Sequence, residues 1–90
     1  MYFVYVLKSE VDGSFYKGYT QNLEVRIKEH NSGKSPYTSR KIPWKLVYSE
    51  QVDTLPEAIA RERYFKTGAG RRFLKSIVTN IVELPPVRQV

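Results

Sequence analysis

Hydrophobic and polar positions alternate with a period of two in three stretches of the chain. Residues 2–8 mix aromatic and β-branched side chains, residues 14–20 do so again, and Asp12-Gly13 between them is a turn signal. Residues 44–52 show the same alternation. The pattern predicts a β-hairpin followed later by a third strand packed against it.

Alternation also assigns side chains to the two faces of each strand. On the first strand it places Tyr5 on the face of Phe3, and on the second it places Tyr16 on the face of Gly18. The two tyrosines share a face of the sheet only if the register between the strands permits it. The sequence leaves that register open.

A period near 3.6 appears between the hairpin and the third strand. Residues 22–31 place Leu23 and Ile27 on one side, which predicts an amphipathic helix with Thr20 or Asn22 as its N-cap. The polar, basic stretch that follows, residues 34–43, reads as a loop.

Two further helices are expected after the third strand. Thr54 and Glu57 have the spacing of a capping box, and Gly68 is the expected end of the helix that they begin. A last short helix is expected to open at Gly70, with an apolar stripe from Phe73 onward. The element order is then β-β-α-β-α-α. It corresponds to an α/β fold of the α+β type, in which helices flank a small three-stranded antiparallel sheet.

Length and residue usage narrow the class of protein. Ninety residues predict one domain, residues 1–82, followed by a flexible tail, residues 83–90, that contains two adjacent prolines. The absence of cysteine excludes disulfides, and a single histidine excludes the usual zinc-finger ligand sets. The opening apolar run is far shorter than a membrane span of about 20 residues. We therefore expect no membrane association and a cytoplasmic location.

The charge balance points to an anionic partner. Fifteen lysines and arginines against nine acidic residues leave a formal net charge of +6. A basic domain of this size favours nucleic acid through phosphate contacts and counterion release. Many small basic domains are merely well solvated, so charge alone sets a direction and not a function.

Side chains of the kinds used in phosphodiester hydrolysis occur in order along these elements: Tyr5, Tyr16, Arg26, His30 and Glu62. Arg26 and His30 lie four residues apart on a predicted helix, so they share one stripe and can meet one ligand. Taken singly, each residue has a plainer interpretation, as a core tyrosine, a helix-end histidine or a surface ion pair. Their joint order is the informative feature.

The chemistry of these residue types is compatible with such a site. A single carboxylate such as Glu62 can suffice for Mg²⁺, which keeps most of its waters and also binds substrate oxygens. Arg26 can bind a phosphate and offset its charge. His30 could donate a hydrogen bond, position a tyrosine or take up a proton, and its type does not separate these roles. Tyrosine is an awkward base, because its ordinary pKa is about 10.

The spacing Y-x(10)-Y-x-G, then R-x(3)-H and a later helical glutamate, resembles the GIY-YIG nuclease family. The likeness is greatest to its small single-domain bacterial branch, which is similar to the excinuclease C amino-terminal domain. Phe3 and Val4 stand where the family's first motif is named for glycine and isoleucine. The resemblance implies the GIY-YIG nuclease fold and an endonuclease dependent on Mg²⁺ or Mn²⁺ that cuts DNA, in repair or in the processing of structured DNA.

The resemblance also implies roles for individual residues. Tyr5 would activate the attacking water, Tyr16 would contact the phosphate or order that water, and Glu62 would hold the metal. Arg26 and His30 complete the catalytic set. These assignments come from the family and not from the spacing.

Four further positions are candidates for contact with the substrate. Gly18 suits a close approach of the backbone to a phosphate. Lys41 lies in the basic loop, and Arg71 and Arg72 lie near a predicted helix amino terminus, where a phosphate can bind. All three cations have the alternative of simple solvation. Lys17 points away from the face of Tyr16 and is expected to be a solvated surface lysine.

One departure from the family leaves a second function open. Larger members carry an asparagine soon after the metal-binding glutamate, whereas the only later asparagine here is Asn80, 18 residues after Glu62. The chain is therefore either an active endonuclease or a nucleic-acid-binding module with weak or no catalysis. A protein-interaction module would leave the ordered residues unexplained. A monomer or a weak homodimer is expected.

Overall fold

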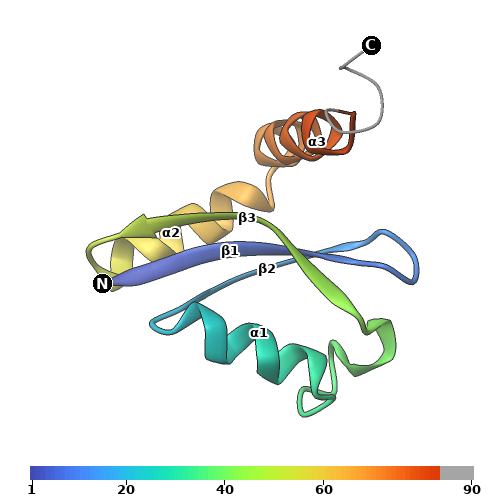
Figure 1. The fold of residues 1–90 in the computed structure, drawn as a ribbon. Helices are drawn as coiled ribbons and strands as arrows, with labels where there is room; N and C mark the ends of the chain where they lie inside the picture. Colours follow the sequence, from blue (N-terminus) through green and yellow to red (C-terminus); the bar gives the residue numbers. More distant parts are fainter. Residues whose placement is uncertain (84–90) are drawn as a thin grey trace.

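The computed structural model describes the backbone of residues 1–83 and the side chains of residues 1–77. A three-stranded antiparallel sheet lies between helices (Figure 1), and its strand order is β2-β1-β3. The strands are β1 (Tyr2–Ser9), β2 (Phe15–Thr20) and β3 (Trp44–Val52). The predicted sheet and the order β-β-α-β-α-α are confirmed.

The hairpin turn between β1 and β2 forms where Asp12-Gly13 predicted it. Asp12 Oδ1 accepts hydrogen bonds from the backbone N of Ser14 at 2.9 Å and from its Oγ at 2.7 Å. Gly13 adopts a φ of 77°, which a side chain would disfavour. The turn settles the register: Tyr5 pairs with Gly18 and Leu7 with Tyr16.

This register places Tyr5 and Tyr16 on the same face, diagonal to each other across the two strands. Helix α1 (Leu23–Asn31) covers that face, as Figure 1 shows. Of the two predicted caps the structure uses Asn22, whose side-chain oxygen accepts a hydrogen bond from Val25 N at 3.1 Å. A short 3₁₀ helix, η1 (Ser39–Lys41), interrupts the loop that leads to β3.

Helices α2 (Leu55–Phe65) and α3 (Gly68–Glu83) lie on the opposite side of the sheet (Figure 1). The predicted capping box is present: Thr54 Oγ1 accepts from Glu57 N, and Glu57 Oε1 accepts from Thr54 N at 3.0 Å. The apolar core on this side consists of fully buried residues from β1 and both helices: Val4, Val6, Ala58, Phe65 and Leu74.

The predicted boundary between the last two helices was wrong. Helix α3 begins at Gly68, and Gly70 lies inside its first turn instead of opening it. Gly70 packs directly on the end of α2, where an added Cβ would collide with the carbonyl oxygen of Tyr64 and lie 2.6 Å from Phe65 Cα. Close packing, and not a turn, therefore requires glycine at this position.

Thr67 caps the amino terminus of α3, because its hydroxyl accepts a hydrogen bond from Gly70 N at 3.1 Å. The helix continues to Glu83 and is longer than predicted, and of the predicted stripe Leu74 is buried while Phe73 is 38% exposed. The predicted flexible tail, residues 83–90, lies outside the described residues except for Glu83, which ends α3.

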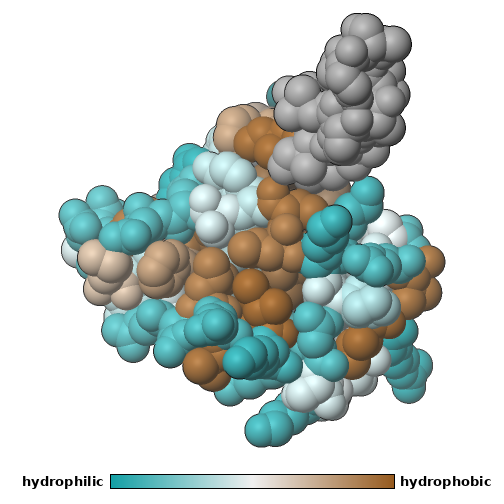
Figure 2. Space-filling model, viewed as in Figure 1, coloured by the Kyte–Doolittle hydropathy of each residue, from teal (hydrophilic) through white to brown (hydrophobic). Residues whose placement is uncertain are grey.

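The surface is mixed in character. Figure 2 shows hydrophobic atoms gathered at the centre of the viewed face, with hydrophilic atoms toward its margins. Within residues 1–83, none of the helices has the length and apolar character needed to cross a membrane.

Candidate active site

Tyr5 and His30 form the buried centre of the α1 side. Tyr5 lies on the central strand, and its ring points toward the last turn of α1, where His30 is fully buried. Tyr5 Oη lies 2.9 Å from His30 Nε2, within hydrogen-bond distance. The helix stripe that carries His30 and the strand face that carries Tyr5 are therefore in direct polar contact.

Thr38 completes this contact on the other side of the imidazole. Its Oγ1 lies 3.0 Å from His30 Nδ1, and its carbonyl oxygen accepts a hydrogen bond from Trp44 Nε1 at 2.9 Å. Asn31 ties the end of α1 to the same tryptophan through its side-chain amide, which bonds both the backbone N and O of Trp44.

Sequence reasoning missed Thr38, because a threonine in a polar loop looks solvated. The available signal was Trp44, whose indole N–H needs a partner once the ring is buried.

Tyr16 joins the two buried rings at the surface of the protein. Its ring centroid lies 4.7 Å from that of His30 and 6.3 Å from that of Tyr5. Tyr37, which is 80% exposed, stands beside it at a centroid distance of 5.9 Å. The cluster thus runs from a buried phenol to an exposed one.

Gly18 is required by Tyr5. Its Cα faces the phenol across the strand pair, and an added Cβ would lie 2.7 Å from Tyr5 Oη and 2.8 Å from Tyr5 Cζ. Real Cβ atoms do not approach a neighbour so closely, so any side chain here would displace the tyrosine. Contact of Gly18 with a substrate phosphate stays a prediction.

Burial and neighbouring charges set the protonation of this centre. Burial raises the pKa of Tyr5 to about 12, and the nearby Arg26 guanidinium offsets only part of that rise. Burial, and then the positive charge of Arg26, lower the pKa of His30. Near neutral pH the site therefore holds a protonated phenol beside a neutral imidazole. Arg26 itself bonds Glu29 at 2.9 Å, in a half-exposed pair.

Glu62 reaches the same region from α2. It lines a hollow of about 360 Å³ together with side chains from β2, the loop before β3 and its own helix: Phe15, Tyr16, Lys17, Tyr37 and Lys66. The Glu62 side chain is 19% exposed and bonds Lys66 Nζ at 3.3 Å. Its charge contributes to the raised pKa of Tyr5, which places the carboxylate in the electrostatic field of the buried centre.

Lys17 lies at this hollow, so its assignment as a solvated surface lysine was wrong. Partial burial, and then the charges of Arg71 and Lys66, lower its pKa. Because β2 is an edge strand next to α2, a long side chain that points away from Tyr16 can still bend around the edge. Lys17 and Lys66 make one side of the hollow cationic, and Arg71 lies near enough to lower the pKa of Lys17.

The remaining predicted substrate contacts lie elsewhere. Lys41 forms an ion pair with Asp12 at 3.2 Å, and its Nζ lies 3.2 Å from Ser14 Oγ, at the hairpin turn. Arg72 is exposed on α3 beside Arg71. Their contact with a substrate, like that of Arg71, stays a prediction.

The donor set fits Mg²⁺ or Mn²⁺ only with help from a substrate. Among residues 1–77, no three or more side chains of the types His, Cys, Asp and Glu gather into a metal-binding group. A hard divalent ion can use one carboxylate, several waters and phosphate oxygens, so Glu62 meets the minimum. Lys66 is 55% exposed and can rotate away from that carboxylate.

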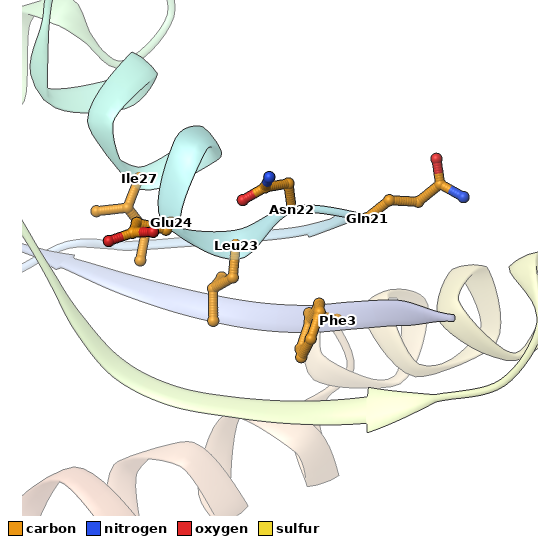
Figure 3. A pocket seen from close by; sticks show the side chains of 6 residues that line it. All are labelled: Phe3, Gln21, Asn22, Leu23, Glu24 and Ile27. Carbon is orange, nitrogen blue, oxygen red and sulfur yellow. The ribbon is translucent and has the colours of Figure 1, made fainter.

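A larger hollow on the other side of α1 has the wrong chemistry for phosphate. Figure 3 shows it between the start of α1 and β1, with a volume of about 540 Å³. Phe3, Leu23 and Ile27 form its apolar wall, and Glu24 is the one ionisable side chain among the six that line it. An acidic, largely apolar surface repels a polyanion.

Comparisons with known proteins find similar sequences. A sequence model described as the GIY-YIG catalytic domain matches residues 1–73. UPF0213 protein SSP2268 from Staphylococcus saprophyticus is 42% identical over 77 residues, which cover 84% of this chain and 93% of that protein. UPF0213 protein BLi00048/BL00536 from Bacillus licheniformis is 48% identical over 66 residues, 72% of this chain and 67% of that protein.

A solved structure is similar as well. The solution NMR structure of the UPF0213 protein BH0048 from Bacillus halodurans has a TM-score of 0.54 and 33% sequence identity. The similarity covers 97% of this chain and 100% of that one.

Proposed function

Because this chain belongs to the family of GIY-YIG catalytic domains, we propose that it is a metal-dependent endonuclease that hydrolyses phosphodiester bonds in DNA. One observation carries the proposal. Tyr5 and His30, in direct contact, lie buried behind Tyr16, and Tyr16 lines a hollow together with Glu62 and two lysines. A phosphate bound in this hollow would lie beside Tyr16, with the buried proton acceptor behind that ring.

The deprotonation of water can avoid a free phenolate. With a pKa of about 12 for Tyr5, ionising that phenol at pH 7 costs about 7 kcal/mol. Tyr5 can instead pass its own proton to His30 Nε2 while its oxygen takes a proton from the attacking water. The 2.9 Å contact between Tyr5 and His30 supports this transfer, and the proposal therefore assigns proton uptake to His30.

The other charged groups act on the phosphate. Arg26 offsets the charge that develops on the non-bridging oxygens, and the half-buried Tyr16, which lines the hollow, contacts the phosphate or orders the water. Glu62 would hold Mg²⁺ or Mn²⁺, which when bound would polarise a phosphoryl oxygen and stabilise the leaving oxygen. Lys17, Lys66 and Arg71 attract the flanking backbone phosphates.

The substrate is DNA recognised by its charge and shape. A small basic face supplies phosphate contacts but few contacts to bases, so sequence selectivity is low. We extend the proposal to DNA repair or the processing of structured DNA. We expect a monomer or a weak homodimer.

A binding module without catalysis is the second candidate. The ion pair between Glu62 and Lys66 neutralises the carboxylate that a metal would need, and burial keeps Tyr5 protonated. Under this alternative the cationic hollow binds nucleic acid in a salt-sensitive way and releases no product.

Cleavage by purified protein separates the two candidates. The assay uses labelled single-stranded, duplex, flap and branched DNA, plus RNA, each with Mg²⁺, Mn²⁺ or EDTA. Wild type and Glu62→Gln are compared with a control variant, Glu24→Gln. Glu24 is an exposed carboxylate on α1 that lies at the other hollow. Metal-dependent cuts that are lost only in Glu62→Gln support the nuclease. Equal binding and no cuts by all three proteins support the binding module.

A further inference from the structure

The imidazole of His30 is enclosed by a chain of hydrogen-bonding groups that begins at Tyr5 and ends in the loop before β3. His30 is fully buried, and each of its ring nitrogens has one partner: Tyr5 Oη for Nε2 and Thr38 Oγ1 for Nδ1. Thr38 is itself fully buried. A neutral imidazole carries one proton, so one nitrogen donates while the other accepts.

The partners decide which nitrogen carries that proton. The phenol of Tyr5 is protonated near neutral pH and needs an acceptor, because a buried hydroxyl without one is costly. Arg26, the charged neighbour of Tyr5, can only donate hydrogen bonds and so cannot accept one from the phenol. His30 Nε2 is therefore the acceptor, and the proton of the imidazole lies on Nδ1, where Thr38 Oγ1 accepts it.

We propose that Thr38 is a positioning residue, whose hydroxyl holds the His30 proton on Nδ1 and so keeps Nε2 open to receive the proton of Tyr5. The catalytic part of this inference rests on the proposed nuclease function. The logic is that of a base oriented by a third group, here with an uncharged hydroxyl in the orienting place.

The proton movements balance over the reaction. The water oxygen bonds to phosphorus while its proton moves to Tyr5 Oη, and the original proton of Tyr5 moves to His30 Nε2. The bond from phosphorus to the leaving oxygen breaks, and that oxygen takes a proton from solvent water. His30 is then an imidazolium that still donates from Nδ1 to Thr38, and it later returns its extra proton to solvent.

Thr38 is held firmly enough to do this. Its carbonyl accepts from Trp44 Nε1 at 2.9 Å and from Lys41 N at 3.2 Å, and its own N donates to Ser35 O at 3.2 Å. These bonds join the loop to the start of β3. These bonds consequently hold the Thr38 hydroxyl in a fixed position opposite His30.

The first test reads the tautomer directly and needs no activity. Since His30 is the only histidine, two-bond ¹H–¹⁵N correlation spectra of the imidazole report on it alone. The wild type is expected to carry its proton on Nδ1, and Thr38→Val to move part or all of the population to the Nε2–H form. Thr38→Ser keeps the hydroxyl and should keep the Nδ1–H form.

Two results would overturn the inference. One is a wild-type imidazole protonated on Nε2, which needs no variant and holds even if Thr38→Val does not fold. The other is a folded Thr38→Val with the wild-type tautomer.

The pH titration of His30 supplies a second readout. The groups that face the ring are Tyr5 from β1, Tyr16 from β2, and Arg26 and Glu29 from α1. All of these groups remain in Thr38→Val. The pKa of His30 should fall further in that variant, because the imidazolium loses the Thr38 hydroxyl that accepts its hydrogen bond. An unchanged titration would count against the role of Thr38.

Kinetics then test the catalytic part. Orienting groups of this kind typically change rates about 10- to 100-fold, so kcat of Thr38→Val on the best-cleaved DNA should fall by that factor with little change in KM. Thr38→Ser should restore most of the rate. An unchanged kcat in folded Thr38→Val contradicts the catalytic role. If the wild type cuts nothing, the nuclease proposal fails while the tautomer result still stands or falls by itself.

Discussion

The two sides of the sheet use the same central strand for different purposes. Alternate residues of β1 send Val4 and Val6 toward α2 and α3, and Tyr5 and Leu7 toward α1. The α2–α3 side is closed by aliphatic and aromatic side chains alone at its buried centre. The α1 side buries a phenol, an imidazole and a hydroxyl in contact with one another.

The difference shows how a small domain can carry a buried polar site. Buried polar groups are tolerated when each has a partner, and every buried side-chain nitrogen and oxygen of the described residues has one. Burial of apolar side chains on the opposite side stabilises the fold and requires no hydrogen-bond partners. Apart from Glu62, which reaches the hollow from α2, substitutions at the two buried centres should therefore separate chemistry on the α1 side from stability on the α2–α3 side.

Tyr5→Phe is expected to have the largest effect, and the effect is on activity. Loss of a proton-transfer group typically costs about 10²- to 10⁴-fold in rate. Stability should fall by less, about 1–3 kcal/mol, because His30 Nε2 loses a buried partner. Single-turnover cleavage and urea unfolding measure the two quantities. Cleavage by Tyr5→Phe at the wild-type rate would show that the Tyr5 hydroxyl on the α1 side does not take part in catalysis.

Phe65→Ala should show the opposite balance. Phe65 is fully buried in the core on the α2–α3 side, and removal of a buried phenylalanine ring typically costs about 3–5 kcal/mol of unfolding free energy. The rate per folded molecule should remain close to that of the wild type at a temperature where the variant is folded. If activity collapses while stability is kept, the two sides do not have separate roles.

The pH dependence of stability gives a smaller effect that belongs to the α1 side. The pKa of His30 is lower in the folded protein than the ordinary value of about 6.5. At a pH between the folded and the ordinary pKa, the unfolded chain therefore binds more protons than the folded protein does. Stability from this group is therefore complete above about pH 6.5 and is lost as the pH falls toward the folded pKa.

Thermal melts of wild type and His30→Gln between pH 7.5 and 5 measure this loss. The wild type should lose more stability over that interval than the variant does. Parallel curves would mean that His30 titrates normally in the folded protein.

Local features of the fold could be predicted from the sequence. The bounds of β3, the Asp12-Gly13 turn and the capping box of α2 depend on neighbouring residues, and the structure agrees with each. Tyr5 and His30 were found from the family spacing, but the register that brings Tyr16 to them was left open by the sequence and is seen only in the structure.

Features that depend on packing between elements could not be predicted in the same way. Gly18 and Gly70 are explained by a phenol and a helix end that approach them from distant parts of the chain. Thr38 has a role only because His30 and Trp44 meet in the folded loop. Lys17 reaches the hollow because α2 packs beside the edge strand.

Single-turnover cleavage of one labelled DNA by wild type and Glu62→Gln, with Mg²⁺ and with EDTA, is the most direct test of metal-dependent hydrolysis at Glu62. We expect product only from wild type with Mg²⁺, and a loss on the order of 10³-fold in the variant, since metal-ion stabilisation of a phosphoryl transition state is worth several kcal/mol. Metal-dependent cleavage at the wild-type rate by Glu62→Gln would contradict this expectation.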